Sequence, residues 1–313
     1  MNFAGIRRFF LSATLIIVIS RSTIAATILL QPVSDTTLTE FAPNNNLGGT
    51  AFVNAGSSGV NANGARNRAL YRFDFSSIPA NSKIKSAAVT LEVAFAPGAA
   101  QSSSFALHRM LRSWGEGDKD STGEQSPGVG LPATANEATW NSPFAFTTNT
   151  WTAPGASNDF SSTVSSRTDV YDVGDFPVFS STAQLVADVQ YWLDHPTNNF
   201  GWMLKTESED VFFTARRFTS HEFVGEDTNS PPNLDIEFIP PPMVFGTQIT
   251  NGQFRFSFPA ESNAAYKVEY KNVLASTNSW LTLTNIAASP APTNILVFDM
   301  ISFATRFYRV IPQ

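Results

Sequence analysis

The residues of this sequence best suited to binding chemistry are arginines within strand-like segments. Arg68 and Arg72 stand four positions apart where every second residue is apolar, so both side chains leave the same face of a strand. A planar guanidinium can donate two parallel hydrogen bonds to a carboxylate. The pair therefore indicates recognition of an acidic sugar such as a uronic acid. An ion-pair ladder formed by Arg72 and Asp74 is the structural alternative.

Three further side chains extend the predicted ligand face. Arg216 and Arg217 are adjacent in a strand-like run and must point to opposite sides, so at most one of them, taken as Arg217, joins the face. His108 lies in a strand-like run as well. Trp114 ends that run and opens a glycine-rich loop, where binding sites often lie. For Trp114, as for the other tryptophans of the central region, packing in the core is the alternative.

Catalytic motifs are missing from the sequence. Its three histidines are His108, His195 and His221, and none shows the spacing of a zinc or nucleophile motif. His195 follows a predicted helix, where a positive charge is favourable. We therefore expect a protein that is not an enzyme, with a polysaccharide lyase that uses His, Tyr and Arg as the alternative.

An acidic loop suggests one metal hypothesis. Asp118, Asp120 and Glu124 are spaced somewhat like calcium ligands, but position twelve of that loop is Val129 instead of an acid, which excludes an EF-hand. A structural Ca²⁺ held by these three acids is one interpretation. A solvated acidic loop without a cofactor is the other.

The elements that must position these residues are strands. Short alternating apolar runs, separated by Gly, Pro, Asn and Ser, are typical of an all-β sandwich. In the run from Ala87 to Phe95 the odd positions are apolar, which predicts one face in a core. Helical periodicity occurs once, from Ser181 to Asp194, with Ser181 or Thr182 as the cap and His195-Pro196 as the stop.

Composition changes at residues 240–243, where three prolines in a row predict a stiff linker. We expect a sandwich over residues 27–239 and a small β-sandwich module over residues 244–313. The second segment has short alternating runs and the size of a domain with a thin core.

The N-terminus predicts export. Arg7 and Arg8 precede an apolar run from Phe9 to Ile19, and small residues follow, so residues 1–26 have the pattern of a secretory signal peptide. No later segment is long and apolar enough for a membrane span. We expect a secreted, extracellular protein of bacterial type, and the lack of cysteine means that no disulfide stabilises it.

Charge argues against a nucleic-acid partner. The net charge is −6, and removal of residues 1–26 would leave 17 basic against 26 acidic residues, a net charge of −9. Binding to phosphate backbones needs a basic surface, which this balance does not favour. The sequence does not predict an oligomeric state.

Several sequence blocks occur in a characteristic order: DTTLTEFAPNNNLGG (35–49), RALYRFDFSSIPANSKIKSAAVTLEV (68–93), LHRMLRSWGEG (107–117), EATW (137–140), LVADVQYWLDHPTNNFGWMLK (185–205), TARRFTSHE (214–222) and PPNLDIEF (231–238). Through these blocks, residues 27–239 resemble the DNRLRE-type domains, which are also grouped as carbohydrate-binding module family 96. The C-terminal segment resembles a fibronectin-III-like module in its strand pattern and in the RFYRV ending (306–310).

The resemblance to DNRLRE domains implies a jelly-roll-like β-sandwich and, for some members, binding to polysaccharides such as alginate. Together with the arginines, it leads us to expect a non-catalytic protein that binds an acidic polysaccharide. A structural surface or matrix protein without a specific glycan ligand is the alternative from a different class.

Overall fold

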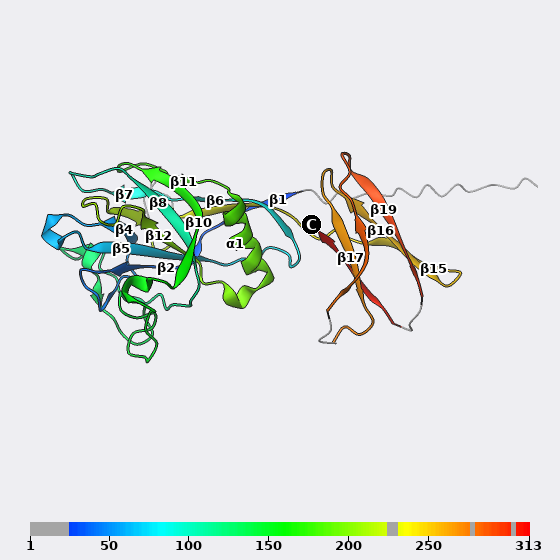
Figure 1. The fold of residues 1–313 in the computed structure, drawn as a ribbon, viewed down its shortest axis with the longest axis horizontal. Coiled ribbons are helices and arrows are strands. Elements are labelled where there is room, and N and C mark those ends of the chain that lie inside the picture. Colours follow the sequence, from blue (N-terminus) through cyan, green and yellow to red (C-terminus); the bar gives the residue numbers. More distant parts are fainter. Residues whose placement is uncertain (1–24, 224–230, 276–278, 302–304) are drawn as a thin grey trace, which may run out of the picture.

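The computed structural model describes residues 25–223, 231–275, 279–301 and 305–313. The predicted signal peptide lies almost wholly outside these residues. Within them, strands dominate and every pairing between two named strands is antiparallel. The predicted all-β sandwich class is confirmed. Figure 1 shows a larger N-terminal unit that carries the helix and a smaller C-terminal unit of strands.

The larger unit is built from two main sheets. The smaller of the two has the order β1-β14-β6-β11, and the larger has the order β10-β8-β12-β5-β4-β13-β7, with β2 also paired to β5. The strands of the first sheet are β1 (Ala26–Leu30), β6 (Lys83–Thr90), β11 (Val178–Phe179) and β14 (Asn233–Ile239). Those of the second are β2 (Pro32–Thr39), β4 (Phe52–Ser57), β5 (Arg66–Phe73), β7 (Val93–Phe95), β8 (Ser103–Met110), β10 (Phe160–Val170), β12 (Trp202–Thr206) and β13 (Arg216–Thr219). A short pair, β3 (Asn45–Asn46) with β9 (Leu131–Pro132), joins two loops.

The main core lies between these two sheets. It takes alternate residues from both, such as Val89 and Ile236 from the first and Tyr71, Leu107 and Phe218 from the second. This arrangement follows from the period-two pattern of the strands, because one face of each sheet is apolar and must be buried.

One α-helix of the described residues, α1 (Ala183–Asp194), packs against this core. The sequence predicted a helix here, from Ser181 to Asp194. Thr182 caps it, because its hydroxyl accepts a hydrogen bond from the Leu185 N–H at 3.0 Å. His195 ends it, and its backbone N–H donates to the Tyr191 carbonyl. The buried face of α1 includes Leu185, Val189 and Trp192, which pack in the main core.

A second apolar cluster covers the outer face of the larger sheet. Leu38 and Leu70 from β2 and β5 contact residues of the long segment 111–159 that crosses this face, namely Trp114, Ala138, Trp140, Trp151 and Ala156. The sequence predicted a ligand-binding face here, through Arg68 and Arg72. For most of β5 that prediction is wrong, because the segment 111–159 has no strand periodicity that would reveal its place in the fold.

The C-terminal unit has two three-stranded sheets. One has the order β15-β16-β19 and the other β18-β17-β20. Their strands are β15 (Phe245–Thr250), β16 (Gln253–Ala260), β17 (Tyr266–Lys271), β18 (Leu281–Ile286), β19 (Thr293–Met300) and β20 (Phe307–Pro312). Phe256, Phe258, Tyr266, Val268 and Val310 form most of its small core.

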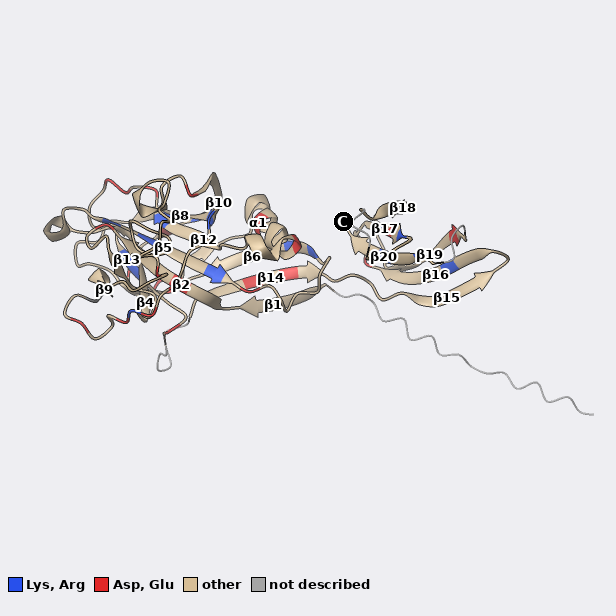
Figure 2. Cartoon of the chain, turned by 90° about the horizontal axis from the view of Figure 1, so that it is seen from below, with Lys and Arg blue, Asp and Glu red and all other residues tan. Residues whose placement is uncertain are grey.

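Charged residues of both signs are interspersed along the described strands and loops of both units, as Figure 2 shows. Among the described residues, no helix is long and apolar enough to cross a membrane.

Limited proteolysis is expected to cleave first near residues 240–243. This segment is outside the strands, between β14 and β15, and each unit has its own apolar cluster. Ile239 packs with the C-terminal core, so the expected fragments divide after this residue. Mass spectrometry of the digest checks the boundary. A chain first cleaved within either sandwich would contradict it.

Candidate ligand-binding groove

Three neighbouring strands of the larger sheet place one polar and aromatic row on its outer face. Asn54 of β4 is the register partner of Arg217 of β13, and Arg217 is in turn the partner of Phe95 of β7. Residues paired across antiparallel strands share a face. The next residue of β13, Phe218, packs in the main core, so Arg217 points the other way.

Arg217 is only partly exposed, and none of the described acids pairs with it. Its guanidinium carbon lies 4.9 Å from the centroid of the Phe95 ring, which is a cation–π contact. No hydrogen bond or ion pair to another described residue involves its side chain. Burial lowers the pKa of the Arg217 guanidinium, and no carboxylate acts in the opposite direction. Arg217 therefore has the donors of its fork available for a ligand.

A loop that contains Pro127–Val129 approaches this arginine closely. A Cβ atom at Gly128 would lie 3.3 Å from Nη2 of Arg217 and 3.8 Å from the side-chain atoms of Asn54. Glycine at this position thus allows the loop to come near the guanidinium without filling the space above it.

The three residues of this row line an open groove of about 410 Å³. The described residues that line this groove, which we call the Arg217 groove, include no Asp, Glu, His, Lys or Tyr. Its polar lining includes the amides of Asn54, Asn61 and Gln125, and two half-exposed aromatic rings, Phe41 and Phe95, lie in its wall. This set can bind an anionic, hydroxyl-rich ligand, because amides bond hydroxyl groups and aromatic faces pack on sugar rings.

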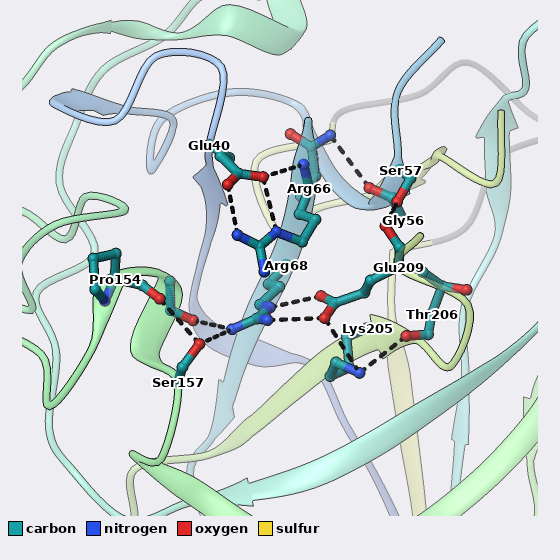
Figure 3. Close-up of polar contacts among 12 residues, drawn as sticks. Glu40, Gly56, Ser57, Arg66, Arg68, Pro154, Ser157, Lys205, Thr206 and Glu209 are labelled. Carbon is teal, nitrogen blue, oxygen red and sulfur yellow. Dashed lines mark hydrogen bonds and ion pairs between the residues drawn. The ribbon is translucent and has the colours of Figure 1, made fainter. Parts of the chain in front are cut away.

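The prediction that Arg68 faces a ligand is wrong. Arg68 is 4% exposed, and its Nε and Nη2 atoms donate to the two carboxylate oxygens of Glu209 at 2.7 and 2.8 Å. Nη1 donates to the carbonyl of Gly155 and the hydroxyl of Ser157 (Figure 3). Segment 111–159 covers Arg68 through Gly155 and Ser157. The carboxylate that Arg68 binds belongs to Glu209 of the protein itself and not to a ligand.

The sequence predicted five ligand residues: Arg68, Arg72, His108, Trp114 and Arg217. Among these described residues, only Arg72 and Trp114 contact each other through a ring interaction, hydrogen bond or ion pair. The Arg72 guanidinium lies 5.5 Å from the Trp114 ring, and its Nη2 donates to the Ser34 hydroxyl. Trp114 itself is 3% exposed and donates its indole N–H to the Phe200 carbonyl. Trp114 therefore packs inside, which is the alternative that the sequence left open. The ladder of Arg72 with Asp74 does not form either, because Asp74 bonds to Ser76.

His108 is also buried. Its Nδ1 atom lies 2.9 Å from the Ser161 carbonyl, and its ring meets Phe160 edge-on. Burial lowers the pKa of His108, so this imidazole favours the neutral form. No hydrogen bond or ion pair between described residues connects it to His221.

The acidic loop does not assemble the predicted calcium ligands. Asp118 pairs with Lys119, and Asp120 accepts a hydrogen bond from the Thr122 N–H. Among the described residues, Asp118, Asp120 and Glu124 do not form a group with the spacing of metal ligands. The structure therefore does not bring the three acids that the sequence suggested as calcium ligands together at one site.

A partly buried polar cluster around His221, which the sequence did not single out as a unit, lies beside β2. Nδ1 of His221 is 3.2 Å from Asp35 Oδ2 and 3.5 Å from Glu116 Oε1, and Nε2 is 3.1 Å from Glu222 Oε1. The hydrogen bond to Asp35 raises the pKa of His221 to about 9. Burial raises the pKa of Glu222 to about 7. We call these four residues the His221 cluster.

Stability is expected to decrease as pH rises from about 6.5 to 9 in metal-free buffer. Because the pKa of His221 is raised above its ordinary value, the folded chain keeps a proton that the unfolded chain has lost. This stabilisation is complete at pH values below the pKa of His221 in the unfolded chain. It is lost as pH rises through the pKa of His221 in the folded chain. Urea unfolding over this pH range measures the decrease, which His221→Gln should flatten. An equal slope in the variant would contradict this assignment.

The comparisons do not place the chain in a family. No protein-family model matches it, and no curated protein is similar enough in sequence to count as a relative. Function is therefore inferred from the residues of the site.

Proposed function

We propose that this protein binds an acidic, uronate-containing polysaccharide without cleaving it, and that the Arg217 groove holds the sugar carboxylate. The observation that carries the proposal is the guanidinium of Arg217, which lies on an aromatic ring and has no acid partner among the residues that the structure describes. In a protein with net charge −6, such a cation is suited to an anionic ligand.

The lining of the groove supports a binding role more than a catalytic one. An eliminating or hydrolysing enzyme needs a general acid or base within reach of the substrate, and the described lining has no carboxylate, imidazole or phenol. The resemblance of residues 27–239 to DNRLRE-type domains is in line with such a role. An exported protein, as the N-terminal pattern predicts, would also meet polysaccharides outside the cell.

The test is a binding panel on the intact protein. Alginate and polygalacturonate are compared with neutral dextran and cellulose, by affinity electrophoresis or calorimetry, at low and high salt. Retention by the uronates alone, weakened by salt, supports the proposal. No binding to any of these polysaccharides would favour a structural surface protein. Release of unsaturated sugars, detected by their ultraviolet absorbance, would indicate a lyase.

A further inference from the structure

The His221 cluster contains more oxygen atoms than its own hydrogen bonds use. Asp35 Oδ1 and Glu222 Oε2 are buried and have no hydrogen-bond partner. Asp35 is fully buried, so its free oxygen cannot reach bulk water. A buried carboxylate oxygen without a partner has a cost in free energy, which a ligand would remove.

The Tyr71 hydroxyl is a third buried group without a partner near this place. Tyr71 is 1% exposed and is the strand-register partner of Asp35, so both side chains leave the same face of the sheet. Burial, and after it the charge of Asp35, raises the pKa of Tyr71. This hydroxyl is outside the four cluster residues, so it is an independent sign of an unfilled polar position.

The cluster is also short of positive charge. Asp35, Glu116 and Glu222 supply three carboxylates, whereas His221 and the more distant Arg72, which acts on Glu116, supply the cations. Burial raises the pKa of all three acids. A cation bound here would favour their ionised forms.

We propose that Asp35, His221 and Glu222 bind one divalent transition-metal ion of the zinc class. One ligand atom from each residue lies within 4.8 Å of the others. Ligands held by Zn²⁺ at about 2.1 Å are about 3.4 Å apart, so small side-chain movements bring the three onto one ion. Imidazole nitrogen with carboxylate oxygens suits Zn²⁺ or Mn²⁺, whereas Ca²⁺ prefers oxygen ligands alone.

Binding of the ion replaces a proton on the imidazole. In the present arrangement His221 bridges two carboxylates through both ring nitrogens, and a metal needs one nitrogen free of its proton. Zn²⁺ affinity should therefore increase as pH rises, because the ligand nitrogen must lose its proton. The site joins the end of β13 to β2, so an ion here would also stabilise the fold.

The experiment uses tag-free protein, stripped with chelator and then titrated with Zn²⁺, Mn²⁺ or Ca²⁺ without any polysaccharide. The readouts are metal content by mass spectrometry, the dissociation constant and the melting temperature. We expect one Zn²⁺ per chain, a higher melting temperature with Zn²⁺ than with chelator, and binding at least about 10-fold weaker in Glu222→Gln. The matched control Glu124→Gln, an exposed acid of the acidic loop, should bind as the wild type does.

His221→Gln keeps the test decisive if the first variant folds poorly, since it removes a different ligand from the same site. Equal Zn²⁺ affinity in both variants and the wild type would overturn the proposal, as would equal melting with Zn²⁺ and with chelator. Stabilisation by Ca²⁺ alone would overturn the assignment to the zinc class. The absence of polysaccharide separates these outcomes from those that test the Arg217 groove.

Discussion

Replacing Glu209 with alanine should lower the free energy of unfolding by about 3–5 kcal/mol, because it leaves the charge of Arg68 buried without a carboxylate. Glu209 accepts two hydrogen bonds from Arg68, and its Oε2 atom lies 3.6 Å from Nζ of Lys205. After the change, Arg68 keeps only the neutral acceptors at Gly155 and Ser157. These cannot neutralise the guanidinium.

Glu40→Ala is the matched control, because Glu40 also pairs with an arginine through both oxygens. Figure 3 shows the two pairs side by side, and their chief difference is burial: Arg66 and Glu40 are 39% and 35% exposed, against 4% and 18% for Arg68 and Glu209. An exposed pair contributes about 0–1 kcal/mol, so Glu40→Ala should have a small effect.

Equilibrium urea unfolding of both variants and the wild type measures the difference, provided that the urea dependence of the free energy stays the same. Equal losses in the two variants would mean that burial of the Arg68–Glu209 pair adds nothing.

The strand pattern was predictable because period-two alternation is a local property. The alternation of Ala69, Tyr71 and Phe73 identified the inner face of β5 correctly, and the helix Ala183–Asp194 followed from its cap and periodicity. Both depend on residues that are close in sequence.

What covers the other face was not predictable, since it depends on contacts between distant residues. Arg68 meets Glu209 across 141 positions of sequence, and no local pattern connects them. The place of Phe95 in the fold was likewise not predictable from its local sequence. This residue continues the apolar alternation of residues 87–93, yet the chain leaves β6 after Thr90 and enters the other sheet as β7, where Phe95 is 48% exposed.

The candidate site was predictable only in part. Arg217 was predicted because it alternates with Arg216, and the structure places the two on opposite sides, with Arg216 1% exposed. The partners of Arg217 in the groove, Asn54 and Phe95, come from other strands. For Asn54, the only local signal of a role in the site was a polar residue inside an otherwise apolar strand.

The largest functional effect is expected from Arg217→Ala, which should weaken uronate binding at least about 30-fold, equivalent to 2 kcal/mol or more for a charged hydrogen-bonded partner. The fold should be retained, because no described acid pairs with Arg217, so the change leaves no described carboxylate buried without its partner. Arg217→Lys should recover only part of the affinity, since an ammonium group cannot reproduce the two parallel hydrogen bonds of the guanidinium.

Arg72→Ala distinguishes this groove from the other arginine surface that the sequence indicated. Arg72 lies on Trp114 and bonds to Ser34, outside the described lining of the Arg217 groove. Calorimetry with alginate oligosaccharides should therefore give Arg72→Ala a dissociation constant close to that of the wild type. Binding that survives Arg217→Ala but is lost in Arg72→Ala would move the uronate site to Arg72, because the free guanidinium of Arg217 would then have no part in recognition.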